Sequence, residues 1–171
     1  MADVNPEART VDAGTGEIIV SDLTSRRTHD ATRVPALLDQ IDRPLASISA
    51  DGAYDTHAVY EAAHEQGEGR AVRVLIPPGR NARLSAQPSP ALKERNCNIR
   101  SVRKLGRREW HTRSGYSMRS LVENAVYRYK TIIGRTMRSR SLEGQRVEVD
   151  LASKILNTMT RLGMPDSYRV G

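Results

Sequence analysis

Hydrophobic positions in the first half of the chain form short runs separated by turn-forming residues. The runs predict, in order, a strand over residues 17–23, a helix over 29–41, a strand over 44–50, a helix from Asp55 or Thr56 to Gly67, and a strand over 71–76. A strand–helix–strand unit implies parallel pairing with a right-handed crossover, so this order is typical of an α/β domain. Residues 1–10 are polar and aperiodic, and we expect a loose leader there.

The second half of the chain is predicted to be helical. Residues 77–94 hold four prolines and no hydrophobic period, which predicts a surface loop. A basic stretch over 95–113 follows, and it fits either a solvated helix or a phosphate-binding face. A helix over 116–133 should end at Gly134, and a last helix over 145–162 is expected to bury Val149, Ile155, Leu156 and Met159.

The helix predicted over 116–133 carries a polar stripe beside its core-facing stripe. Tyr116, Arg119, Glu123 and Lys130 stand at i, i+3, i+7 and i+14, and at 100° per residue they fall within a sector of roughly 60°. The apolar members of the helix lie in a different sector: Leu121, Val122, Ala125, Tyr129, Ile132 and Ile133. A solvated face with an ordinary Arg119–Glu123 surface pair is one interpretation of the polar stripe.

The amino-acid composition limits the classes of partner that the chain is expected to bind. The chain has 171 residues, of which 27 are Lys or Arg and 20 are Asp or Glu, and its net charge is +7. This balance favours attraction to a polyanion, most plausibly nucleic acid. The single cysteine excludes an internal disulfide, and no apolar run reaches the length of a membrane span. We therefore expect a cytoplasmic protein without a membrane partner.

The spacing Y-x2-R-x3-E-x6-K resembles the signature of the DDE transposases of bacterial insertion sequences. The segments ISADGAYDT, VDAGTGEIIVSDL, VLIPPGR and LGMPDSYRV resemble further parts of the same family. The resemblance implies that Glu123 is the third metal-binding carboxylate, that Arg119 and Lys130 contact DNA phosphates, and that Tyr116 is the aromatic member. It also implies Mg2+, with Mn2+ as a substitute, and double-stranded DNA at the element's ends and target.

Asp51 is the candidate for the second metal-binding carboxylate. It ends the strand predicted over 44–50, and open α/β sheets place their chemistry at the carboxyl ends of strands. A turn or helix cap ahead of Gly52 is the alternative interpretation. Asp55 is expected to act only as a cap.

The sequence also departs from the family pattern. The family's first acid lies on the first central strand of a ribonuclease H-like sheet, upstream of VDAGTGEIIV, and no such strand is found here; Asp12 is a weak candidate for that acid. The expected fold is an incomplete ribonuclease H-like α/β domain over 11–171, with a mixed sheet flanked by helices. The helical DNA-end-binding region of the family is missing as well.

Three interpretations of function remain open at this stage. The first is a DDE transposase fragment that binds DNA and is inactive alone. The second is a non-enzymatic basic DNA-binding protein that competes with an intact transposase, and the third is a remnant too short of its sheet to fold stably. A second copy of the chain or an intact transposase would be the protein partner.

Overall fold

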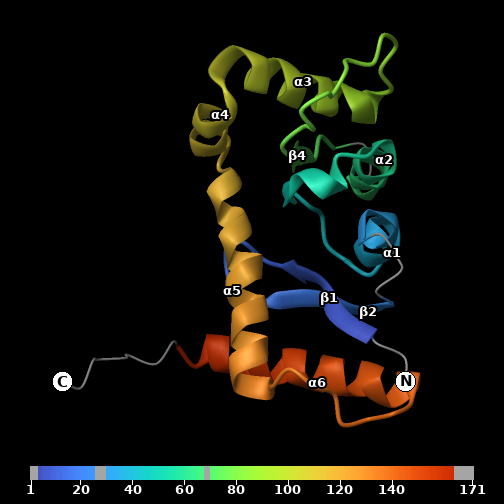
Figure 1. Cartoon of the computed structure of the whole chain (residues 1–171), viewed down its shortest axis with the longest axis vertical. Coiled ribbons are helices and arrows are strands. Elements are labelled where there is room, and N and C mark those ends of the chain that lie inside the picture. The colour runs from blue at the N-terminus through green and yellow to red at the C-terminus, as the bar shows by residue number, and fades with distance from the viewer. Residues whose placement is uncertain (1–3, 26–29, 68–69, 164–171) are drawn as a thin grey trace, which may run out of the picture.

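The computed structural model describes residues 4–25, 30–67 and 70–163. It is elongated, with α3 and α4 toward one end and α6 at the other, and α5 runs lengthwise between them (Figure 1). The LGMPDSYRV segment lies largely outside the described residues, as do residues 1–3 and His29. In the described part of the chain, no helix has both the length and the apolar composition needed to cross a bilayer.

The first element is an antiparallel hairpin of β1 (Val4–Val11) and β2 (Ile18–Ser25). The expectation of a loose leader over residues 1–10 is wrong for residues 4–10, which belong to β1. The sequence of these residues is polar and has no hydrophobic period, so the pattern did not predict a strand. The strand is held instead by backbone hydrogen bonds to β2. The connecting turn is closed by Asp12, whose carboxylate accepts the backbone N–H groups of Gly14 at 2.7 Å and Thr15 at 2.9 Å.

The first predicted helix and the strand–helix–strand unit that follows it both form, with shorter elements than predicted. After a 3-10 turn, α1 (Val34–Leu38) carries Pro35 in its first turn, where a missing N–H costs nothing. β3 (Ser47–Ser49) pairs in parallel with β4 (Arg73–Leu75), and α2 (His57–Gln66) connects them. Gly67 follows the last residue of α2, and a side chain does not fit there, because a Cβ would lie 2.4 Å from the carbonyl oxygen of Arg70.

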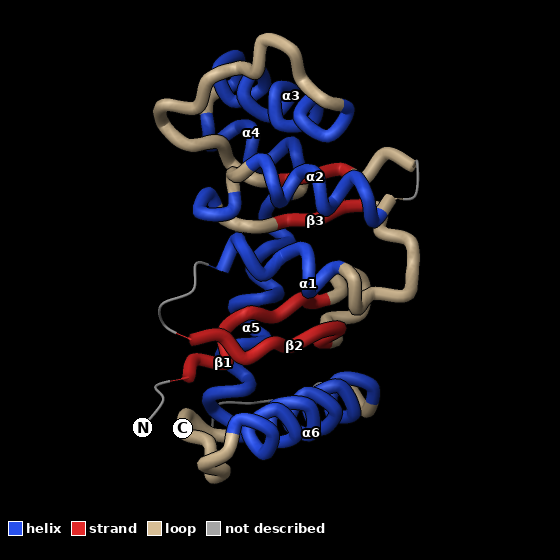
Figure 2. Tube along the Cα trace, turned by 90° about the vertical axis from the view of Figure 1, so that its right-hand side faces the viewer, coloured by secondary structure: helices blue, strands red, loops and turns tan. Residues whose placement is uncertain are grey.

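The described strands form two separate two-stranded sheets, β1–β2 and β3–β4, where a single mixed sheet was expected. Helices bridge them: one hydrophobic cluster joins Val20 of β2, Leu37 and Leu38 of α1, Tyr60 of α2 and Val74 of β4. Figure 2 shows the two sheets at different levels along the molecule, with α1 between those levels. Backbone hydrogen bonds therefore hold each strand pair, and side-chain packing holds the pairs together.

The loop predicted over 77–94 is shorter than expected, because α3 (Pro90–Leu105) begins within it. Ser89 caps this helix by accepting the N–H of Leu92 at 3.3 Å, and Pro90 occupies the first turn. The basic stretch is thus helical, in α3 and α4 (Arg107–Ser114). Gly106 separates the two helices with a φ of 79°, a conformation that favours glycine.

The helix predicted over 116–133 consists of three helical forms. A 3-10 turn (Tyr116–Arg119) leads into α5 (Ser120–Arg128), which widens into a π-helical turn (Tyr129–Ile133) before Gly134. Ala125 and Tyr129 are buried as predicted, whereas Ile132 is 46% exposed.

The last helix, α6 (Leu142–Arg161), packs on β2. It buries Val149 and Leu156 as expected. Ile155 and Met159 were expected in the core but are 43% and 36% exposed, so α6 has apolar side chains on its outer face as well.

Candidate functional site

Asp51 stands just beyond the carboxyl end of β3, as its position in the predicted strand required. Its Oδ1 accepts the backbone N–H of Ala53 at 2.8 Å and caps the short 3-10 turn Gly52–Tyr54. The interpretation of Asp51 as a turn cap therefore accounts for its Oδ1 atom only. In the described part of the chain Oδ2 accepts no hydrogen bond, so half of the carboxylate is available for another partner.

Glu123 lies in the first turn of α5 and pairs with Arg119, whose Nη2 is 2.6 Å from Oε1. The Glu123 side chain is 60% exposed, and the i,i+4 geometry is that of an ordinary surface ion pair. The 3-10 turn stacks Tyr116 beneath Arg119, because residues i and i+3 eclipse in that helix. The guanidinium carbon of Arg119 is 5.8 Å from the centre of the Tyr116 ring.

Tyr116 lies in the 3-10 turn that contacts β3, the strand that leads to Asp51. Its ring is buried against Leu75 and Trp110, and the Tyr116 and Trp110 rings are 5.6 Å apart. Burial raises the pKa of the Tyr116 phenol; the Arg119 charge opposes this shift, and the negative charges of Asp51 and Glu123 add to it. The charges of Asp51, just beyond β3, and of Glu123, in α5, thus both act on the Tyr116 phenol.

Lys130 lies in the π-helical turn, one helical stretch beyond Glu123, and is exposed. The predicted spacing assumed a uniform α-helix, but the change of helical form alters the angle between Glu123 and Lys130. π-helical turns are rare and often occur at functional sites. Lys130 therefore stays a predicted phosphate contact.

His111 is a neighbour of this site that the sequence pattern did not indicate. Its ring centre is 4.5 Å from that of Tyr116. Its Nε2 is buried and finds no hydrogen-bond partner in the described part of the chain. Burial lowers the pKa of this imidazole, and the charges of Arg107 and Arg119 lower it further. A lone His after Trp110 carries no spacing signal, so only the folded chain reveals it.

The carboxylates present do not make a complete metal site on their own. Carboxylate oxygens suit Mg2+, but the described residues contain no group of three His, Cys, Asp or Glu side chains that could hold a metal ion. Asp12, the weak candidate for a further ligand, is engaged in the hairpin turn and in an ion pair with Arg43. The hydrogen bond from the N–H of Thr15 is the main cause that holds the pKa of Asp12 below its usual value.

The loop after β4 begins directly beside Asp51. A Cβ on Gly52 would lie 3.2 Å from the carbonyl oxygen of Pro77, so the two backbones are in close contact. Asp55 does not cap α2 as expected, because its carboxylate pairs with Arg95 at 2.8 and 3.1 Å and accepts the N–H of Gly79. The pair is buried, with 6% and 11% of the side chains exposed.

Further side chains from α3 and α4 hold the same loop. Asn96 exchanges two hydrogen bonds with the backbone of Ser85, at 3.0 and 3.1 Å. Arg103 and Arg107 donate to the carbonyls of Ala82 and Pro78. With Arg95, three of the arginines in the basic stretch thus have structural roles. The loop in turn exposes Arg80 and Arg83, which were not predicted as site residues.

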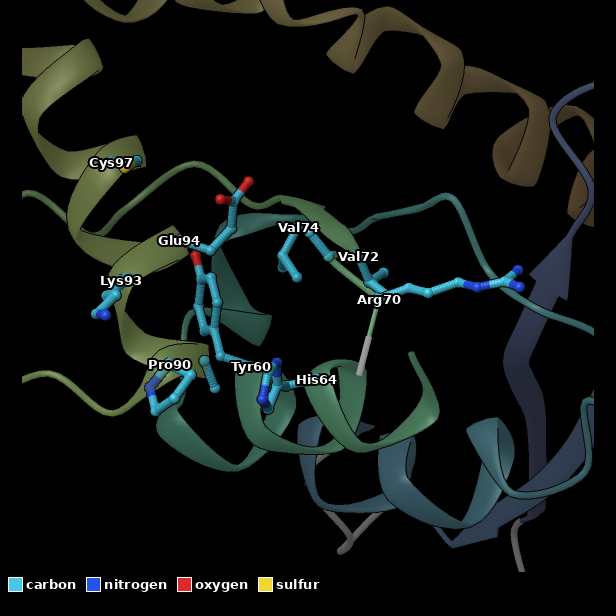
Figure 3. Close-up of a pocket in the computed structure, with 11 residues that line it drawn as sticks. Tyr60, His64, Arg70, Val72, Val74, Pro90, Lys93, Glu94 and Cys97 are labelled. Carbon is cyan, nitrogen blue, oxygen red and sulfur yellow. The ribbon is translucent and has the colours of Figure 1, made fainter. Parts of the chain in front are cut away.

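A separate hollow of about 230 Å³ lies between α2, α3 and residues 70–74 (Figure 3). Tyr60, His64, Lys93, Glu94 and Cys97 are among its lining residues, and none of the five predicted site residues is. Burial raises the pKa of the Tyr60 phenol to about 12. The hollow is therefore distinct from the carboxylates around Tyr116.

The structure is that of a basic α/β protein in which β3, the strand that leads to Asp51, contacts the 3-10 turn that carries Tyr116 and Arg119. A family model described as the transposase DDE domain matches residues 10–158. The chain therefore belongs to the DDE transposase family, as the resemblance in the sequence indicated. We found no solved structure that matches it.

Proposed function

We propose that this chain is a DNA-binding part of a DDE transposase whose complete form cleaves phosphodiesters and transfers DNA strands. The family supports transposition in general. The observation that carries the finer proposal is the contact between β3, the strand that leads to Asp51, and the 3-10 turn that precedes Glu123. These two acids are the second and third carboxylates that the family pattern requires.

Arg119 and Lys130 would hold the DNA backbone. Both are cations on the segment that carries Glu123, and phosphate contacts fix the register of DNA without reading its sequence. Arg119 is paired with Glu123 in the free chain. A phosphate oxygen would compete for the guanidinium, and transfer of Arg119 to DNA would free the carboxylate. Tyr116 would position Arg119 through its buried ring, with its hydroxyl as the group nearest DNA.

Arg80 and Arg83 extend the proposed DNA-contacting surface. They stand on a loop whose backbone is held by Asp55, Asn96, Arg103 and Arg107 and which begins beside Asp51. A pre-ordered loop loses little conformational entropy on binding, so its contacts contribute more of their energy to affinity.

The complete catalytic site needs a further carboxylate. We propose that it comes from a polypeptide segment other than those of this chain, consistent with two short sheets that share no strand. Two bound Mg2+ ions supply such sites with an activated nucleophile and stabilise the leaving oxygen. The described residues alone offer no three-carboxylate group, so the chain is expected to bind DNA without cleaving it.

The test is nicking of supercoiled plasmid by the purified chain in Mg2+ or Mn2+, beside Asp51→Asn and Glu123→Gln. We expect plasmid binding without nicking from all three proteins. Nicking that both substitutions abolish would support the two acids but show that the third ligand lies within this chain. Nicking that survives both substitutions would overturn the site.

A further inference from the structure

The outer face of α6 is apolar and has no covering element. Among the exposed large apolar side chains of the described residues, more belong to α6 and its C-cap than to any other element. They form a stripe that we call the α6 outer stripe: Val147, Leu151, Ile155, Met159 and Leu162. Leu162 is 82% exposed and Val147 66%. In both views α6 forms one end of the molecule (Figures 1 and 2).

This stripe is not the face by which α6 joins the fold. The adjoining sector of the helix carries the buried Val149, Ala152 and Leu156. Next to these, Asn157 bonds both the N–H and the carbonyl of Ile18, each at 2.8 Å. The inner face is thus fully engaged with β2. The outer stripe repeats with helical spacing over about 22 Å at 1.5 Å per residue, which suits packing against another helix.

The charged side chains beside the α6 outer stripe indicate which kind of partner fits it. Along one edge, the amino-terminal half of α6 presents Glu143 and Asp150, and the carboxyl-terminal half presents Lys154 and Arg161. An antiparallel crossing of two α6 helices at the level of Ala152 sets Asp150 opposite Lys154 of the second copy. The same register sets Glu143 opposite the second copy's Arg161, which in the single chain pairs with Glu17. Leu151 then meets Ile155 of the second copy near the two-fold axis.

We propose that the α6 outer stripe is a self-association surface, which joins two copies of this chain through an antiparallel α6–α6 pair. One register satisfies both the apolar stripe and its charged edge, as an isologous interface requires. A single helix pair is smaller than a standard protein interface, so we expect dissociation on the order of micromolar. The proposal does not depend on the proposed function.

The first test is sedimentation of the full chain between about 1 and about 200 µM, a range that brackets such an affinity. The average mass should rise from 19.0 kDa toward twice that value. Leu151→Asp should remain monomeric, whereas Leu84→Asp, at an exposed loop position away from α6, should behave like the parent. A constant monomer mass, as expected if another segment or another protein covers the stripe, would overturn the proposal.

Charge exchange tests the register. Asp150→Lys places like charges opposite each other in the dimer, and so does Lys154→Asp, so each variant alone should dimerise at least tenfold more weakly. A mixture of the two variants restores both opposite-charge pairs and should form heterodimers. Single variants that dimerise like the parent, or a mixture that stays monomeric, would contradict the antiparallel register.

Discussion

The pair of Arg119 and Glu123 has the geometry of an ordinary surface ion pair. The same geometry is compatible with a functional role. The pair is exposed and separated by one helical turn, so it contributes only a few tenths of a kcal/mol to stability. That small energy leaves Arg119 free to exchange Glu123 for a phosphate. The residue spacing singled out these side chains as candidates, whereas the contact between β3, which leads to Asp51, and the 3-10 turn of Tyr116 needed the fold, because it joins two distant elements.

The partly buried imidazole of His111 predicts a pH-dependent stability. Its pKa lies below the ordinary value of 6.5 in the folded chain, because burial and nearby arginines disfavour the charged ring. Below pH 6.5 the unfolded chain therefore binds more protons, and the free energy of unfolding falls until pH reaches the folded pKa. Urea unfolding at about pH 7.5 and about pH 5.5 measures this loss.

The matched variants separate His111 from other titrating groups. His111→Gln should show a smaller loss between the two pH values than the parent, whatever its absolute stability. His64→Gln, at an exposed position on α2, should show the parent's loss. An equal loss in the parent and in His111→Gln would refute the role of this imidazole.

At the scale of elements, the buried Asp55–Arg95 pair is the main tie between the loop after β4 and α3. Removing one partner of a buried pair leaves an uncompensated charge, which costs roughly 3–5 kcal/mol. Asp55→Ala should therefore lower the free energy of unfolding by about that amount. It should also speed tryptic cleavage after Arg80 and Arg83, because the loop loses its anchor at Gly79.

Glu109→Ala is the control, because it breaks an i,i+4 pair whose side chains are 48% and 66% exposed. It should change stability by no more than about 0.5 kcal/mol and leave tryptic cleavage of the loop unchanged. Similar effects of Asp55→Ala and Glu109→Ala would mean that the loop is held by the remaining contacts alone.

The sequence predicted which segments are helices and which are strands more reliably than it predicted how these elements pack together. The parallel β3–β4 pair and the stop at Gly134 were predicted from strand order and glycine punctuation. α6 carries two apolar stripes with the same helical period, so the period alone does not show which of the two is buried. Ser153 and Asn157 decide it, since both bond to β2, and that information is tertiary.

The molecule as a whole consists of two small sheets joined by helices, with a net charge of +7. The sequence predicted the α/β composition but not the separation of the sheets, because pairing between distant strands leaves no local signal. The basic stretch over 95–113 is not one free basic surface, because Arg95, Arg103 and Arg107 hold the loop after β4. Under the proposed function, Arg80, Arg83 and Arg119 would contact DNA.

DNA affinity measured against salt concentration tests the central claim most directly. The logarithm of the binding constant should fall linearly with the logarithm of salt concentration, and Arg119→Ala and Lys130→Ala should each reduce the slope by about one phosphate contact. Lys93→Ala, beside the separate hollow, should leave the slope unchanged. A parent chain that does not bind double-stranded DNA, or equal slopes in the parent and both site variants, would contradict the account.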